Sequence, residues 1–275
     1  MLVKNWKRQF FIDQLIKLPL KFIGMMMLYA LTQTIIFASA SIFTKKNHVF
    51  MQHKLSHLEV MMLLGIMIII WLGGTFIVPA VWRVLENHSR PFFKAVVWEI
   101  KIIPKRWQFC LKKWWHLMRT PTFLRTLFLT WFVMALCMVI LMNFAQQNTT
   151  SNQAELDAIL KGTLGQKIAL NFLAIIVAPI FEENIFRHLI VQSLFKYEGY
   201  LPDSLLDAVA LIVSACSFGL FHQPANFVEF FLYSMMGAFM FWMYRRYGLE
   251  GSISLHMLNN TVASVESLFA LGLMI

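Results

Sequence analysis

The chain contains a succession of long apolar stretches, each close to the roughly 20 residues that cross a bilayer as a helix. We expect about seven such spans, at residues 22–43, 60–81, 126–144, 167–195, 205–222, 227–244 and 252–273. Hydrophobic residues make up 59% of the chain and charged residues only 14%, which excludes an ordinary soluble domain. The sequence therefore predicts an all-α fold, a polytopic membrane helical bundle of about seven transmembrane helices with amphipathic interfacial helices. A polar loop is expected at 145–165.

Most basic residues lie outside these spans. They gather at residues 1–21 and, interleaved with tryptophans, at 83–125, and the formal net charge of the chain is +10. In a soluble protein such segments would suggest a nucleic-acid surface, but beside membrane spans they are typical of helices lying on anionic lipid. We therefore expect the lipid bilayer, and no nucleic acid, as a partner. Because positive charge favours the cytoplasmic side, the pattern predicts a cytoplasmic N-terminus and an extracellular C-terminus.

One apolar stretch is interrupted by charge, because Glu182, Glu183 and Arg187 lie inside the span at 167–195. A charge at the bilayer centre costs about 2.5–3.5 kcal/mol, so such groups usually face a cavity or one another. On a helix Glu183 and Arg187 are one turn apart and are expected to form an ion pair, whereas Glu182 points elsewhere. Pro179 is expected to kink the helix just before them. The motif is either a structural clamp between helices or part of a functional site.

Further polar residues lie at the edges of later spans. His222 ends the fifth expected span, and His256 and Asn260 lie one helical turn apart in the seventh. A single histidine in a membrane helix is most often a packed, hydrogen-bonded group. Two histidines, an asparagine, two glutamates and an arginine on three helices can instead build a polar pocket. Such a set supports amide hydrolysis, in which a carboxylate and a histidine activate water and other donors stabilise the oxyanion.

Three motifs together carry a resemblance to a known family. They are Glu182-Glu183-x-x-x-Arg187, Phe218-x-x-x-His222 and His256-x-x-x-Asn260. In order and spacing they resemble the motifs of the CAAX-protease and bacteriocin-processing (CPBP, or Abi) family of intramembrane proteases. The resemblance covers about residues 165–265. We therefore predict an N-terminal membrane region with basic interfacial segments, 1–160, followed by a catalytic membrane core, 161–275.

The resemblance implies an intramembrane endopeptidase that hydrolyses peptide bonds of a membrane-associated peptide or protein. It implies that Glu182 activates water with the assistance of His222. It also implies that His256 and Asn260 form the oxyanion site, while the Glu–Arg pair supports this geometry. Lys-rich and Met-rich features with few cysteines are typical of a bacterial plasma-membrane protein, and the three cysteines indicate no disulfide framework.

The cofactor and the alternative functions follow from the same residues. The chain has no H-E-x-x-H zinc helix, although Glu182, His222 and His256 could ligate zinc from separate helices. We expect a metal-free site, with zinc as the alternative. Non-proteolytic alternatives are a membrane adaptor or a bacteriocin self-immunity protein that acts by binding. A small transporter is disfavoured because the sequence shows one acidic cluster and no inverted repeat.

Overall fold

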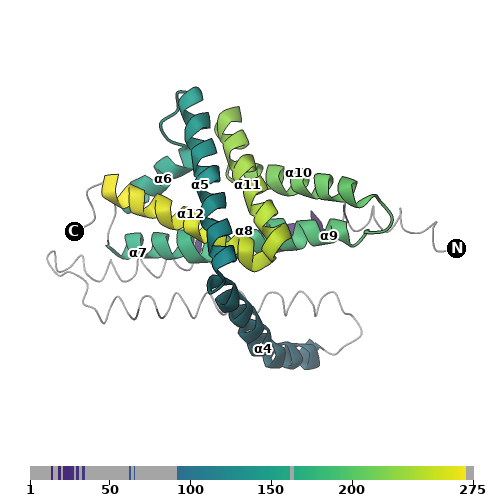
Figure 1. Cartoon of the computed structure of the whole chain (residues 1–275). Coiled ribbons are helices and arrows are strands. Elements are labelled where there is room, and N and C mark those ends of the chain that lie inside the picture. Colours follow the sequence, from purple (N-terminus) through teal and green to yellow (C-terminus); the bar gives the residue numbers. More distant parts are fainter. Residues whose placement is uncertain are drawn as a thin grey trace. The chain divides into compact units, whose positions relative to one another are not determined.

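The structure, a computed structural model, describes residues 92–161 and 164–270 together with scattered positions before residue 92 (Figure 1). Apart from those positions, the basic segment at 1–21 and the expected spans at 22–43 and 60–81 lie outside the described residues. The described elements are α4 (Phe92–Met118), α5 (Pro121–Phe144), α6 (Ser151–Leu160), α7 (Leu164–Phe172), η3 (Leu173–Val177), α8 (Ala178–Glu183), η4 (Asn184–Val191), α9 (Gln192–Phe195), α10 (Asp203–Phe221), α11 (Phe227–Tyr247) and α12 (Leu249–Ala270). They include no β-strand, so the all-α prediction is confirmed for this part of the chain.

Four of the described helices are long and apolar enough to cross a membrane. They are Pro121–Phe144, Gln166–Phe195, Asp203–Phe221 and Phe227–Tyr247, which correspond to the third to sixth predicted spans. The predicted seventh span is also a helix, α12, but it is not among these four, because polar residues such as Ser252, His256 and Asn260 interrupt its apolar character. The described helices are those of a multi-pass membrane protein, while the prediction of seven transmembrane helices is not confirmed.

The predicted polar loop at 145–165 is wrong in part, because it contains α6. The hydroxyl of Thr150 accepts a hydrogen bond from the backbone N–H of Gln153 at 3.2 Å and so caps the N-terminus of this helix. A threonine followed three residues later by glutamine is a known signature of a helix start. The polar composition of the segment concealed this signature, and a loop was expected in its place.

The helix α4 carries much of the basic and aromatic segment that was expected to lie on lipid. Phe109, Leu111 and Trp115 are exposed on it, and so are Lys112 and Lys113. Large apolar side chains that are exposed beside lysines agree with a helix at a membrane surface. The interfacial position of α4 stays a prediction.

The chain forms two compact units. One combines Met1–Gly24, Arg125–Lys161 and Ala174–Ile275, and the other combines Met25–Leu124 and Gly162–Leu173. All the predicted site residues belong to the first unit. The predicted division of the chain at residue 160 into two regions stays a prediction.

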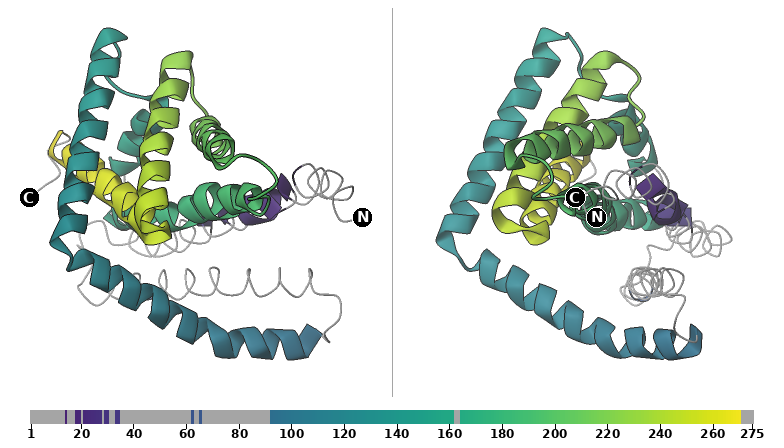
Figure 2. Two further views of the ribbon diagram at one scale, coloured as in Figure 1. Left: turned by 45° about the vertical axis from the view of Figure 1, so that its right-hand side comes forward. Right: turned by 90° about the vertical axis from the view of Figure 1, so that its right-hand side faces the viewer.

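Within the first unit, five elements pack against one another in a ring. The helix α11 packs against both α10 and α12, and Figure 2 shows it connecting these two helices. The acidic motif lies on α8 and η4, of which α8 packs against α12 and η4 packs against α10. Residues on α8, α10 and α12 are therefore brought around a common interior.

Small residues allow α10 and α11 to approach closely. A Cβ atom added at Gly219 would lie 2.9 Å from the carbonyl oxygen of Phe230 and would collide with the hydroxyl of Ser234. A Cβ atom added at Gly237 would lie 3.0 Å from the Cα atom of Ala215. Such small-residue contacts replace the hydrophobic driving force that is missing between helices in lipid. They place the end of α10, where His222 lies, firmly beside α11.

Candidate active site

The acidic motif lies in a helical segment that contains two π-helical stretches. The short helix α8 ends with both glutamates, and the π-helical segments η3 and η4 flank it. A π turn changes which side chains face a neighbouring helix, and such turns occur frequently at functional sites. Glu182 is 4% exposed and Glu183 is 0% exposed, so both carboxylates are buried among the helices.

Glu183 is the centre of a buried polar network. Its Oε2 atom lies 3.0 Å from Nε of Arg187, with neither side chain exposed, and the hydroxyl of Ser252 donates to the same oxygen. Arg187 also donates from Nη2 to the carbonyl oxygen of Gly237 at 3.0 Å, and its guanidinium lies 4.7 Å from the ring centre of Phe218. The predicted ion pair between Glu183 and Arg187 is confirmed, and it links the acidic helix to α10, α11 and α12.

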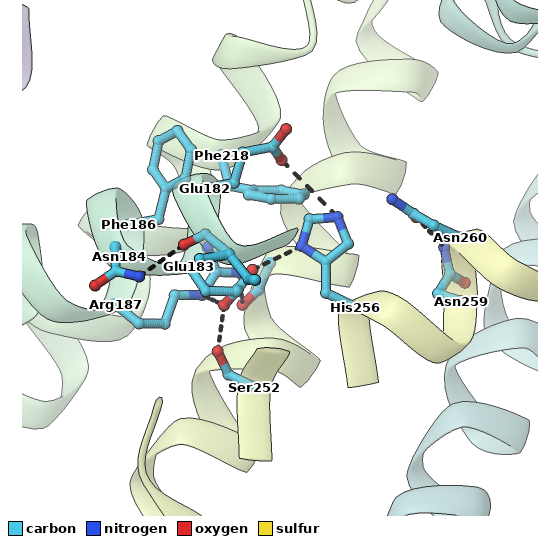
Figure 3. Close-up of polar contacts among 12 residues, drawn as sticks. Glu182, Glu183, Asn184, Phe186, Arg187, Phe218, Ser252, His256, Asn259 and Asn260 are labelled. Atoms are coloured by element: carbon cyan, nitrogen blue, oxygen red, sulfur yellow. Dashed lines mark hydrogen bonds and ion pairs between the residues drawn. The ribbon is translucent and has the colours of Figure 1, made fainter. Parts of the chain in front are cut away.

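His256 is held by the same carboxylate. Its Nδ1 atom lies 2.9 Å from Oε1 of Glu183. Because Glu183 also pairs with Arg187, we assign it as an ionised acceptor and place the proton of this bond on Nδ1 of the histidine. The other ring nitrogen, Nε2, lies 3.9 Å from Oε2 of Glu182, and Figure 3 shows the ring reaching both glutamates.

His222 approaches Glu182 from the end of α10. Its Nδ1 atom lies 2.9 Å from the carbonyl oxygen of Phe218, so this nitrogen carries the proton, and Nε2 points away from that bond. Nε2 lies 3.9 Å from Oε2 of Glu182. The imidazole contacts the ring of Phe218 with centres 4.5 Å apart, and it stacks on the ring of Tyr233 with centres 4.4 Å apart.

The structure thus brings three of the predicted residues together around one oxygen atom. Oε2 of Glu182 faces Nε2 of His222 and Nε2 of His256, at 3.9 Å in each case. This distance exceeds a direct hydrogen bond, and it is a spacing at which a bridging water or a substrate atom can connect the groups. The three side chains come from α8, α10 and α12.

Asn260 has a different neighbour. Its Nδ2 atom donates to the carbonyl oxygen of Ala174 at 2.7 Å. Ala174 lies in the π-helical segment η3, where a carbonyl accepts from the N–H five residues later, and that residue is Pro179, which has no N–H. Backbone carbonyls inside a helix bundle need a donor, and Asn260 supplies it. Asn260 therefore replaces the hydrogen-bond donor that Pro179 lacks.

The side chains of the site include possible zinc ligands. Among the residues that the structure describes, no group of three or more His, Cys, Asp or Glu side chains is arranged to hold a metal ion. Glu182, His222 and His256 have the right ligand chemistry, and an oxygen acceptor holds the Nδ1 atom of each histidine, as is usual around zinc. However, tetrahedral ligands of zinc lie about 3.4 Å from one another, which is closer than the 3.9 Å seen here. The spacing does not fit zinc, and we derive no step through a metal.

Two further residues contact the site and were not predicted. Ser252 lies one turn before His256 on α12, so the four-residue spacing of a helix could have pointed to it. Tyr233 lies in the aromatic and apolar sequence of α11, where no pattern distinguishes it from its neighbours. Its contact with His222 depends on the packing of α10 against α11.

Comparison with known proteins finds a family model that is similar to this region. No curated protein and no solved structure matches the chain. The family model described as "Type II CAAX prenyl endopeptidase Rce1-like" matches residues 164–262, which include every predicted site residue. This range agrees with the one over which the three motifs resemble the CAAX-protease family, so that resemblance is confirmed. Residues 164–262 of the chain are therefore similar to the Rce1-like family of type II CAAX prenyl endopeptidases.

Proposed function

We propose that the protein is an intramembrane endopeptidase that hydrolyses peptide bonds of a membrane-associated peptide or protein. The observation that supports this most strongly is the position of Glu182. Its carboxylate is buried among apolar helices and faces the Nε2 atoms of His222 and His256 at 3.9 Å each. A carboxylate flanked by two imidazoles can take a proton from water while the imidazoles orient the water and the substrate.

In the proposed reaction Glu182 is the general base. A water between Glu182 and His222 attacks the carbonyl carbon of the scissile bond, and its proton passes to Glu182. The Nδ1 proton of His222 is engaged by the carbonyl of Phe218, so Nε2 is left as an acceptor that orients this water. A C–O bond forms in this step, and the substrate carbonyl oxygen gains the negative charge.

His256 is the proposed donor to that oxyanion. Donation from its Nε2 atom requires protons on both ring nitrogens, and Glu183 is the acceptor that the Nδ1 proton needs. Asn260, one turn along α12, is proposed as a second donor through the amide proton that Ala174 does not take. Loss of one oxyanion donor typically lowers the rate by about 10²–10³.

The intermediate collapses when the C–N bond breaks and Glu182 returns its proton to the leaving amine. Throughout the reaction, Glu183 and Arg187 contribute no net charge to the site. Before water is deprotonated, the negative charge of Glu182 is balanced by a cationic His256. A site that is neutral overall is less costly to place among membrane helices than one with an uncompensated charge.

The proposed location is a bacterial plasma membrane, with a cytoplasmic N-terminus and an extracellular C-terminus. The distribution of basic residues supports this orientation, because the main basic block at 83–125 then lies inside. The substrate class is a lipid-modified or membrane-inserted peptide. The description of the matching family names a CAAX prenyl endopeptidase, which makes a prenylated peptide the first compound to test.

A comparison of peptides in cells tests the proposal. Membrane-released peptides are identified by mass spectrometry in cells that produce the wild type, Glu182→Ala or the control Glu198→Ala, in which an exposed carboxylate is removed. We expect a set of new peptide termini that is lost only with Glu182→Ala. Identical sets in all three strains would contradict proteolysis and favour a membrane adaptor or a self-immunity protein that acts by binding.

A further inference from the structure

The orientation of the His222 imidazole depends on a neighbouring side chain. It caps the C-terminus of α10, and the next residue, Gln223, has a left-handed φ of 48° as the chain turns toward α11. Helix ends fray more readily than helix interiors. The single hydrogen bond from Nδ1 to the carbonyl of Phe218 fixes one atom of the imidazole, and the ring can still tilt about that bond. The rings of Phe218 and Phe221 also contact the imidazole, with centres 4.5 and 5.6 Å away, but they lie at 45° and 88° to its plane. A contact that lies flat against the imidazole restricts its tilt further.

Tyr233 provides that contact. Its ring lies nearly parallel to the imidazole of His222, with an interplanar angle of 16° and centres 4.4 Å apart. Tyr233 is 6% exposed and lies on α11, the helix that packs most extensively against α10. Aromatic rings at this separation attract one another beyond the area that they bury. The stacked ring therefore restricts the tilt of the imidazole.

Tyr233 is in turn held from its hydroxyl end. This hydroxyl and the hydroxyl of Thr150 form a buried hydrogen bond at 2.8 Å, and Thr150 is the N-cap of α6. Glu229, one turn before Tyr233 on α11, also contacts the start of α6. Its carboxylate accepts hydrogen bonds from Gln147 at 2.8 Å and from the backbone N–H and hydroxyl of Ser151. The start of α6 and the first turns of α11 thus form one hydrogen-bonded support behind the tyrosine ring.

We propose that Tyr233, fixed by Thr150, is a positioning residue that keeps Nε2 of His222 directed at Glu182. This inference rests on the proposed function, in which His222 orients the attacking water. Tyr233 touches neither water nor substrate in this scheme, and it acts through the imidazole. Displacement of a catalytic group by about 1 Å can cost about 10²-fold in rate, so loss of the stack should lower kcat.

The test measures kcat and KM of the purified protein in liposomes. The probe is a fluorogenic peptide that ends in a farnesylated cysteine followed by three residues, hereafter the reporter peptide. The variants are Tyr233→Leu, which removes the ring, and Tyr233→Phe, which keeps the ring and removes the hydroxyl. The matched controls are Tyr244→Leu and Tyr244→Phe, because Tyr244 is a buried tyrosine on the same helix whose hydroxyl pairs with Gln192. Thermal unfolding gives the folded fraction by which kcat is divided.

We expect Tyr233→Leu to lower kcat per folded molecule by about 10²-fold with little change in KM. Tyr233→Phe should lose only about fivefold, the effect of one hydrogen bond, while both Tyr244 variants should keep the wild-type kcat. Thr150→Val should also lower kcat about fivefold, and it should lower kcat no further when it is combined with Tyr233→Phe. This last comparison tests the positioning role even if Tyr233→Leu does not fold, because the losses of kcat from two unrelated structural defects would add.

The outcomes separate this inference from the function on which it rests. If His222→Ala cleaves the reporter peptide at the wild-type rate, the proposed function is overturned, and this inference with it. If His222→Ala is inactive but the Leu variants at 233 and 244 lose kcat equally, only the positioning role is overturned. Additive losses in Tyr233→Phe and Thr150→Val would also overturn it.

Discussion

Removal of Arg187 is the substitution whose effect on stability can be worked out most fully from the structure. The side chain is 0% exposed and pairs with Glu183 at 3.0 Å. It also donates to the carbonyl of Gly237 and lies over the ring of Phe218. The substitution Arg187→Ala leaves the carboxylate of Glu183 buried without its cation. Loss of one partner from a buried ion pair costs about 3–5 kcal/mol.

A change of this size alters the ratio of folded to unfolded protein by about 10²- to 10⁴-fold. The control is Arg245→Ala. Arg245 pairs with Asp207 at the same 3.0 Å, but the two side chains are 44% and 46% exposed. Exposed pairs contribute only about 0–1 kcal/mol, so this variant should behave nearly as the wild type.

The assay combines the folded yield after extraction from membranes with thermal unfolding in detergent, followed by tryptophan fluorescence. A double variant, Glu183→Gln with Arg187→Met, removes both charges of the pair. It should recover much of the stability that Arg187→Ala loses, because no uncompensated charge remains. It should stay inactive, because a neutral glutamine replaces the carboxylate that holds Nδ1 of His256.

Two results would refute this reasoning. If Arg187→Ala unfolds at the same temperature as Arg245→Ala, the buried pair does not support the fold. If Arg187→Ala is fully folded but inactive, Arg187 acts on the substrate or the transition state directly, and its assignment as a supporting residue is wrong.

Three further predictions concern zinc, the orientation of the protein in the membrane and the backbone carbonyl of Ala174. The purified active protein should contain no stoichiometric zinc and should keep its rate in strong chelators, and inhibition that zinc reverses would contradict the metal-free proposal. Single cysteines at Asn184 and Asn259 should react with thiol reagents from the cytoplasmic side, and labelling only from outside would overturn the orientation. Asn260→Leu should cost about 1–3 kcal/mol by leaving the Ala174 carbonyl without its donor, and Pro179→Ala should recover part of that loss in thermal unfolding. An unchanged melting temperature in Asn260→Leu would refute this structural role.

The local features of the site could be predicted because they depend on helical spacing alone. Glu183 and Arg187 are four residues apart, so a helix must place them side by side, and their ion pair is confirmed. The same spacing separated Glu182 from this pair, and the structure shows Glu182 facing the two histidines. Four of the predicted spans were identified by their apolar length, which is the constraint that a bilayer imposes most directly.

The remaining features depend on contacts between distant parts of the chain. The bond from His256 to Glu183 joins residues on α12 and α8, and no spacing rule connects them. The role of Asn260 at Ala174 depends on the π-helical register of η3, and apolar periodicity in the sequence does not distinguish this register from an α-helix. The reduced apolar character of α12 has a related cause, because this helix carries polar groups of the site on its buried face.

The most direct test of the central claim is hydrolysis of the reporter peptide by purified protein in liposomes. The wild type is compared with Glu182→Gln, which keeps the shape of the side chain and removes the base, and with Glu198→Gln, which makes the same change at an exposed position. The account predicts cleavage by the wild type and by Glu198→Gln at equal rates, and a loss of at least about 10²-fold in Glu182→Gln with an unchanged melting temperature. Cleavage by Glu182→Gln at the wild-type rate would contradict the assignment of Glu182 as the base that activates water.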